Sequence, residues 1–345
     1  MKPKYIIIIL AMVAVITVFY SCKDNPVTPD IKPGRRDYTW TVDTLFIPFT
    51  YLERIWGSSP NDVWAIGPGG DLDKTIYHFD GKKWSNDGIS RMISPISIWG
   101  FGQNDVWLGG LEGRIWHYDG HSWKQSLWIE QKEFVYSGFM DIYGNRPDNI
   151  YAVGFVDSSN VRKGIIYHYN GKEWSRVNIA FTTATLTRIK RGLKTSENYF
   201  IRGIVESNYV EDTTKIFEFN GNSLVQLYSA INLKNNTNFL QNINSEVVFV
   251  IGYSLNEYTE NRGFRKFLDI NNQNFGIQIF GRTEKDIFLR MENGIAHYDG
   301  NNIKYLYTFS EKDNIADGII FKNEVFFLAN NFSQGLNIIY KGILE

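Results

Sequence analysis

The sequence predicts an all-β fold, a seven-bladed β-propeller of four-stranded antiparallel blades, preceded by a signal peptide and a flexible tether. Three observations lead to this fold class. A unit of roughly 44 residues recurs along the chain, Asp-Gly or Asn-Gly pairs mark a tight turn in most of its copies, and 16% of the residues are aromatic, which favours strands. With 345 residues, 43% of them hydrophobic, the chain is long enough for one all-β domain with a buried core.

Residues 1–21 have the features of a lipoprotein signal peptide. Lys2 and Lys4 give a positively charged start, and an uninterrupted apolar run follows from Tyr5 to Tyr20. A membrane-spanning helix needs about 20 apolar residues, so this run is short for a permanent transmembrane anchor. It ends just before Cys22, the only cysteine of the chain, and a single cysteine excludes a disulfide framework.

The segment Val18–Cys22 resembles a bacterial lipobox, with Phe19 in place of the usual leucine. The resemblance implies cleavage before Cys22 and acylation of its sulfur and new amino group, with palmitate among the acyl chains, and hence stable membrane attachment. The Lys23-Asp24 step resembles the surface-export signal of Bacteroidetes-type lipoproteins. We therefore expect a lipid-anchored protein of the bacterial cell envelope, at the outer membrane on its periplasmic or surface side. An uncleaved anchor or an ordinary secreted protein is the alternative.

Residues 22–37 are predicted to form the lipid-anchored tether. They contain three prolines and many charges, with too few apolar side chains to bury a core. An extended chain of this kind spans about 3.1 Å per residue, so the segment would reach roughly 45 Å.

The repeat accounts for the rest of the chain, residues 38–345. Its best-defined copies begin with IWG, continue with NDVWAIG and end with IYHFDGKKW, or with close variants of these strings. They span residues 55–84, 98–123 and 142–174, with weaker copies at 189–224 and 279–303 and degenerate ones at 244–252 and 322–330. One position is aromatic in all seven copies: Trp64, Trp107, Tyr151, Phe200, Phe249, Phe288 and Phe326.

Each copy predicts four strands, which we name A to D from the axis of the propeller outward. Strand A ends near IWG, strand B is the DVWAIG segment, strand C is IYHFD, and strand D begins at the tryptophan of DGxxW. The Asp-Gly and Asn-Gly pairs between strands C and D predict two-residue type I′ turns, which need a positive φ at both positions.

The last copy stops at Glu345 after its strand C, and the missing strand D is expected at the other end of the chain. Trp40 precedes Trp56 by 16 residues, much as Trp84 precedes Trp99 by 15. Residues 38–50 should therefore complete the last blade and leave no open sheet edge.

The units resemble those of a family of secreted bacterial β-propeller lipoproteins with tandem NDVWAVG…HYDGxxW repeats, across residues 38–345. The DGxxW element is also similar to the end of an Asp-box, the hairpin motif of sialidase-type propellers, and Asp80, Gly81 and Trp84 match it. The serine that opens the usual box is missing. In that family the box is structural, so the resemblance implies a propeller fold and no activity.

The connections between strands differ in regularity. The A–B and C–D turns are short and repetitive and share one face of an up-and-down propeller, here called the turn face. The B–C and D–A connections vary and share the opposite face, here called the loop face, where the B–C loop at 252–266 is expected to be the longest. Function concentrates in loops on rigid scaffolds, so ligand-binding residues are predicted on the loop face. The candidates are Trp128, Tyr136, Arg162 and Arg262.

Trp128 is singled out because it is the only tryptophan outside the repeated positions, in the D–A connection at 124–137. An exposed Trp or Tyr there could stack on a ligand or a partner. Packing between blades is the alternative for Trp128, and the mixed charge of the loops also fits an ordinary solvated surface.

The sequence gives no sign of a catalytic centre. It holds no HExxH, Walker or GxSxG motif, and a net charge of −1 gives no indication of nucleic-acid binding. His78, His117, His168 and His297 share one place on strand C, which indicates a recurring structural hydrogen bond in preference to a metal site. We expect a monomer without cofactor or metal.

These observations predict a non-enzymatic envelope lipoprotein that binds or scaffolds a protein or glycan partner through the loop face. The alternative is a carbohydrate-active hydrolase or lyase with its acidic residues on the same face, which would need two facing carboxylates.

Overall fold

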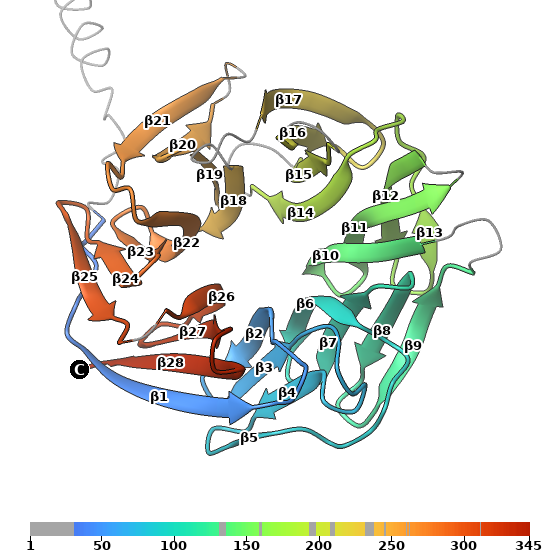
Figure 1. Cartoon of the computed structure of the whole chain (residues 1–345). Coiled ribbons are helices and arrows are strands. Elements are labelled where there is room, and N and C mark those ends of the chain that lie inside the picture. Colours follow the sequence, from blue (N-terminus) through green and yellow to red (C-terminus); the bar gives the residue numbers. More distant parts are fainter. Residues whose placement is uncertain are drawn as a thin grey trace, which may run out of the picture. The chain divides into compact units, whose positions relative to one another are not determined.

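The computed structural model describes residues 31–345 except 131–135, 159–160, 193–197, 208–210, 232–237, 245, 260, 262 and 311. The expected signal peptide and Cys22 lie outside this part. Residues Pro33–Glu345 form one compact unit of seven four-stranded antiparallel sheets arranged in a ring, and the described chain is all-β (Figure 1). The protein is thus a seven-bladed β-propeller. Within the described residues, no helix is long and apolar enough to cross a membrane.

The first four blades follow the chain in the order of strands A to D. They consist of β2 (Arg54–Ser59), β3 (Asp62–Ile66), β4 (Ile76–Phe79) and β5 (Trp84–Ser85); β6 (Pro95–Gly102), β7 (Asp105–Gly110), β8 (Arg114–Tyr118) and β9 (Trp123–Trp128); β10 (Tyr136–Arg146), β11 (Asn149–Ser158), β12 (Val161–Tyr169) and β13 (Trp174–Arg176); and β14 (Thr185–Arg191), β15 (Tyr199–Val205), β16 (Thr213–Phe219) and β17 (Leu224–Ile231).

The last three blades complete the ring. They consist of β18 (Asn238–Ile243), β19 (Glu246–Ile251), β20 (Ser254–Tyr258) and β21 (Phe264–Asp269); β22 (Phe275–Thr283), β23 (Asp286–Met291), β24 (Gly294–Tyr298) and β25 (Ile303–Thr308); and β26 (Asn314–Ile320), β27 (Glu324–Asn331), β28 (Leu336–Leu344) and β1 (Tyr38–Phe46).

The two ends of the propeller chain share the seventh blade. β1 pairs along its whole length with β28, so it supplies strand D of that blade, and it ends at Phe46 instead of residue 50 (Figure 1). Trp40 packs its ring against Tyr307 and Phe327. This exchange of strands covers the edge that β28 would otherwise expose.

The core lies between neighbouring sheets, and a polar cluster recurs beside it. In blade 1, His78 Nε2 lies 2.7 Å from Asp62 Oδ1, Trp64 Nε1 donates to the same oxygen, and the Trp64 and His78 rings stack at 4.1 Å. Blades 2, 3 and 6 repeat the histidine contact, with Asp105, Asn149 and Asp286 as partners. The strand C histidines therefore hold strand B to strand C, and the described residues contain no group of His, Cys, Asp and Glu suited to a metal ion.

The C–D turns differ from the predicted type. Only the glycine of each Asp-Gly or Asn-Gly pair has a positive φ, between +88° and +97°, so the type I′ prediction is wrong. The preceding Asp or Asn side chain takes over part of the turn's hydrogen bonding: Asp80 Oδ1 accepts from the amides of Lys82 and Lys83, each at 2.9 Å. Such an Asx turn satisfies two amides without a strained aspartate.

Two segments lie elsewhere than the sequence predicted. In blade 5, strand C is β20, so the expected B–C loop at 252–266 is instead a tight B–C turn, a strand and a C–D connection at 259–263. Residues 33–37, which the sequence assigns to the tether, contact blade 6: Gly34 N donates to Lys285 O at 2.8 Å, and Arg36 pairs with Asp299 at 3.0 Å. Both partners lie in turns of the turn face.

Candidate functional site

Polar side chains line the axis of the ring. Strand A of each blade is the inner edge of its sheet, and neighbouring inner strands belong to different sheets. Their inward backbone groups therefore lack the partners that a continuous sheet would supply. Polar residues stand at the same level of six inner strands: Arg54, Ser97, Asp141, Arg188, Gln278 and Asp317.

Several of these side chains bridge neighbouring blades by bonding to the backbone of the next inner strand. Asp141 Oδ2 accepts from Ile189 N at 2.9 Å, and Asp317 Oδ2 accepts from Ile55 N at 3.2 Å. The others are Ser97 to Phe139 O at 3.0 Å, Gln278 to Ala316 O at 3.1 Å, and Asn242 to Arg191 O at 2.7 Å. These side chains act mainly as staples between blades.

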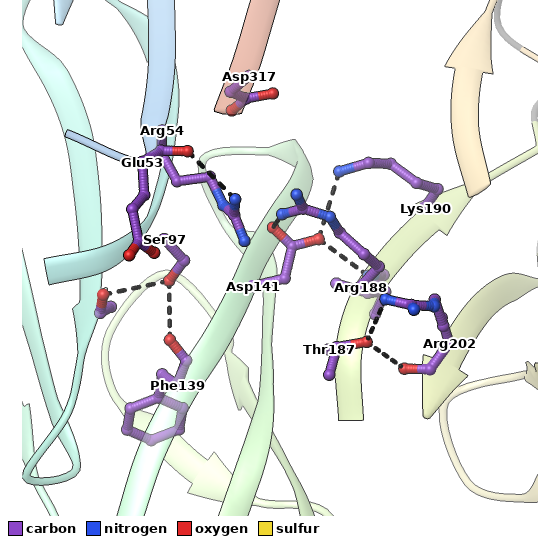
Figure 2. Close-up of polar contacts among 12 residues, drawn as sticks. Glu53, Arg54, Ser97, Phe139, Asp141, Thr187, Arg188, Lys190, Arg202 and Asp317 are labelled. Carbon is purple, nitrogen blue, oxygen red and sulfur yellow. Dashed lines mark hydrogen bonds and ion pairs between the residues drawn. The ribbon is translucent and has the colours of Figure 1, made fainter. Parts of the chain in front are cut away.

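Among the described residues, the cationic side chains at the axis do not form such bonds to the backbone of a neighbouring inner strand. Arg54, Arg188, Lys190 and Arg202 converge on one region of the axis around Asp141 (Figure 2). Asp141 lies 3.3 Å from Lys190 Nζ and 3.8 Å from Arg188, and both Asp141 and Arg188 are buried. For Arg54 and Arg202, the described residues provide no ion pair with a carboxylate. We call these four residues the axial cation cluster.

Electrostatics within the axial cation cluster oppose the charged state. Burial, followed by the nearby Arg188, lowers the pKa of Arg54 to about 10. Burial, followed by Arg188 and Arg54, lowers the pKa of Arg202 to about 10. Burial also lowers the pKa of Lys190, although Asp141 partly compensates. At neutral pH the two arginines remain protonated, so the folded protein confines like charges together.

The propeller has one cavity beside the axial cation cluster and another between two blades. An axial cavity of about 340 Å³ is lined by the aromatic rings of Trp99, Tyr143 and Phe280, with Lys190 as its charged wall. A larger cavity of about 530 Å³ lies between blades 1 and 2, where Trp116, Trp123 and the segment after the short β5 meet. Both volumes fall in the range of about 300–1,000 Å³ that small ligands occupy.

Trp128 and Tyr136 are exposed at the loop face. Trp128 is the last residue of β9, so it ends a strand instead of lying within a connection. The residue is 43% exposed, and the Arg114 guanidinium lies over its ring at 4.7 Å. Tyr136 begins β10, is 37% exposed, and lies 5.3 Å from the ring of Phe155. Both rings are held by neighbours while part of each surface stays open to solvent.

The two candidate arginines have different outcomes. Arg162 lies on β12 at the loop face, where it pairs with Asp157 at 2.9 Å and Glu206 at 2.9 Å and covers the Phe155 ring. It belongs to the same patch as Tyr136, although its charge is already compensated. Arg262 lies outside the described residues, so its role as a ligand-binding residue stays a prediction.

The structure adds loop-face residues that sequence reasoning missed. Ten of the 14 large hydrophobic side chains exposed in the described part lie in B–C or D–A connections or at strand ends that lead into them. None of the 14 lies within an A–B or C–D turn. The loop-face set comprises Phe46, Phe49, Ile89, Met92, Trp128, Tyr136, Val161, Phe181, Ile231 and Phe332. Phe49 is 90% exposed and has a φ of 61°, which is uncommon for an aromatic residue.

Comparisons with known proteins agree with the fold. No family model matches the chain, and no curated protein matches it. Among solved structures, YCF48 bound to a D1 peptide is 16% identical with a TM-score of 0.61, over 90% of this chain and 99% of that one. A catalytically inactive virginiamycin B lyase from Staphylococcus aureus with quinupristin is 12% identical with a TM-score of 0.64, over 89% and 100%. The WD40 propeller domain of Doa1 is 10% identical with a TM-score of 0.60, over 88% and 97%.

At these identities the similarity shows a shared propeller fold and nothing of ligand or activity. Neither the binding of a peptide by YCF48 nor the reaction of the lyase transfers to this chain on that basis. The function has to be argued from the loop face and the axis.

Proposed function

We propose that this protein is a non-enzymatic envelope lipoprotein whose propeller binds a protein partner through the loop face. The observation that carries the proposal is the uneven distribution of exposed apolar side chains, which gather on the loop face and are absent from the described turns of the other face. Exposed aromatic and aliphatic side chains concentrated on one face are the residue types that anchor protein interfaces.

The chemistry of the loop face favours a protein over a glycan. A sugar stacks on flat aromatic rings, whereas the loop face also presents aliphatic residues such as Ile89, Met92 and Ile231. Protein interfaces are enriched in aromatic residues, Met and Arg, and both Trp128 and Phe155 carry an arginine over the ring. A glycan partner, the other class expected from the sequence, would stack on the exposed aromatic rings of this face, Trp128 and Tyr136 among them.

The chain joins the propeller on the turn face. Gly34 and Arg36 are bound to turns of blade 6 on the turn face. A tether that leads from an acylated Cys22 to this point therefore approaches the turn face. The exposed apolar residues lie on the face opposite to this attachment point.

The binding surface is tested by alanine substitution against a glycan array and an extract of the native envelope. Removing an aromatic hot spot commonly costs about 2 kcal/mol or more, roughly thirtyfold in affinity. Trp128→Ala should therefore weaken retention of a discrete envelope protein while leaving the melting temperature nearly unchanged. Trp107→Ala is the matched scaffold variant, and loss of this buried ring should destabilise the fold by about 3–5 kcal/mol.

Two outcomes would contradict this assignment. If Trp128→Ala unfolds the protein as severely as Trp107→Ala, Trp128 belongs to the core. If retention is unchanged when Trp128 and Phe49 are both replaced by alanine, the loop face is not the binding surface. Binding on the glycan array that depends on Trp128 would keep the face and replace the protein partner by a glycan.

The lipid anchor has a separate test. Cys22→Ser removes the sulfur to which the acyl chain would be attached, so the protein should move from the membrane fraction to the soluble fraction. The measurement is the amount of protein that remains in the membrane fraction after a carbonate wash. A variant that stays bound to them would show that another segment holds the protein at the membrane.

A further inference from the structure

We propose that the axial cation cluster is a binding site for a tetrahedral oxyanion, a phosphate or sulfate group. The site is independent of the partner that the loop face binds. It rests on four cationic side chains, Arg54, Arg188, Lys190 and Arg202, which blades 1 and 4 bring together at the axis (Figure 2).

The acidic side chains near the cluster are already engaged. Asp141 Oδ2 serves the amide of Ile189 and the ammonium of Lys190. Asp317 accepts from the amide of Ile55 through Oδ2 and from the amide of Gly318 through Oδ1. Asp141, Asp317 and the adjacent Glu53 partly compensate Arg54, and Asp141 pairs with Arg188, but among the described residues no carboxylate offsets the burial of Arg202.

Two guanidinium groups have capacity to spare. Arg54 donates to the carbonyl of Glu53 at 3.2 Å, and Arg202 donates to Thr187 Oγ1 at 3.4 Å. The Nε atoms of both arginines are buried and have no hydrogen-bond partner among the described residues. A buried N–H without an acceptor is costly, so an anion that accepted from them would stabilise the folded protein.

The position of Arg202 strengthens this inference. On strand B, two residues after the repeated aromatic, blades 1, 3, 5 and 7 place an aliphatic residue and blade 2 a glycine. Those residues are Ile66, Val153, Ile251, Leu328 and Gly109. Blade 6 also places an arginine there, Arg290, but it donates to the side chains of Gln278 and Asn314, whereas the Nε of Arg202 has no partner among the described residues. An aliphatic residue would fit the repeat at position 202 without burying a charge, so the arginine is unfavourable for the fold alone. Residues that weaken the fold in this way mark functional sites.

The geometry favours a tetrahedral anion over a carboxylate. Guanidinium groups pair with phosphate and carboxylate through paired N–H donors. Here the donors come from two blades and from two strands of one blade, so they approach the axis from different directions. A tetrahedral group offers oxygens in each of these directions, whereas a carboxylate offers two in one plane. Arg54 is the first residue of its strand.

The test uses the full chain in detergent and isothermal titration with sodium phosphate or sodium sulfate, with chloride adjusted to keep the ionic strength constant. We expect saturable binding of one oxyanion per chain. Arg202→Ile should weaken binding at least tenfold and raise the melting temperature of the ligand-free protein, because it removes a half-buried charge that has no ion pair among the described residues. Arg54→Gln should also weaken binding and keeps the test valid if the first variant fails to fold.

The control is Arg146→Gln, because Arg146 is exposed on the turn face beside Asp148 and should leave binding unchanged. A sugar phosphate and a sugar sulfate distinguish the source of the group: tighter binding than the inorganic ions assigns the site to the end of a larger ligand, and equal or weaker binding assigns it to the free ion. The proposal is overturned if phosphate and sulfate act no differently from chloride, or if Arg202→Ile and Arg54→Gln both bind like the unaltered protein.

Discussion

At the scale of single residues, the polar cluster beside each repeated aromatic is built with different partners from blade to blade. Blades 1, 2 and 6 pair the strand C histidine with an aspartate, whereas blade 3 pairs His168 with Asn149 at 2.7 Å. Blade 7 replaces the pair by Lys341 and Glu324, 2.7 Å apart, with the ammonium over Phe326. The contact between strands B and C is thus kept while its charge changes.

The amide partner of His168 makes a pH prediction possible. Burial lowers the pKa of His168 below the ordinary 6.5, so the neutral ring is favoured in the folded state. This contribution to stability is present above pH 6.5 and is lost as the pH falls from 6.5 through the folded pKa, because the unfolded chain takes up the proton first. Asn149→Asp should raise the pKa of His168, since a carboxylate favours the imidazolium. Histidine resonances measured by NMR against pH check this, and an unchanged titration of His168 would contradict it.

Repeated residues could be predicted from the sequence, and residues that break the repeat could not. The strand C histidines follow from their period, since a structural hydrogen bond recurs with the blade. The axial cation cluster could not be predicted from the sequence, because its residues belong to different blades that come together only in the closed ring. A signal did exist, since Arg202 and Arg290 replace aliphatic residues in the strand B register.

At the scale of strands, β1 determines whether the ring is closed. Deleting residues 38–46 would leave β28 as an open edge and remove the packing of Trp40 on the seventh blade. We expect a loss of several kcal/mol in the free energy of unfolding, since burial of one large apolar side chain alone contributes about 1.5–3 kcal/mol. Thermal and urea unfolding measure this loss, and an unchanged melting temperature would contradict closure by β1. Val42→Ser is the control, because Val42 is an exposed residue of the same strand and should shift stability by no more than about 0.5 kcal/mol.

Buried asparagines on the last blade hold the crossing from β1 to β2. Asn337 accepts from the amide of Leu52 at 2.6 Å and donates to the carbonyl of Thr50 at 3.0 Å, and Asn330 donates to Leu52 O at 3.1 Å. The closing strand was predictable from the spacing of Trp40, but these clamps have no counterpart in other copies. Blade 5 was misassigned for a similar reason: without the His-Tyr-Asp-Gly string, nothing in the sequence marks strand C at β20.

At the scale of the whole molecule, the two faces of the propeller have different roles in this account. Residues 33–37 contact the turn face through Gly34 and Arg36. Position 34 requires glycine, because a Cβ there would lie 2.8 Å from His297 and 2.9 Å from the backbone of Asp286. The sequence predicted a tether up to residue 37, since its composition is that of a flexible linker. The pairing of Arg36 with blade 6 depends on a tertiary contact that composition does not contain.

The loop face carries the exposed apolar side chains, and the central claim is that the partner meets this face. The most direct test places a photo-crosslinking amino acid, p-benzoylphenylalanine, in the full lipidated chain within intact envelopes. One variant carries it at Trp128 on the loop face, and a matched variant carries it at Lys82, an exposed residue in a C–D turn of the turn face. The account predicts a discrete crosslinked protein from position 128 and none of that mass from position 82. A crosslinked partner obtained from position 82 and absent from position 128 would contradict it.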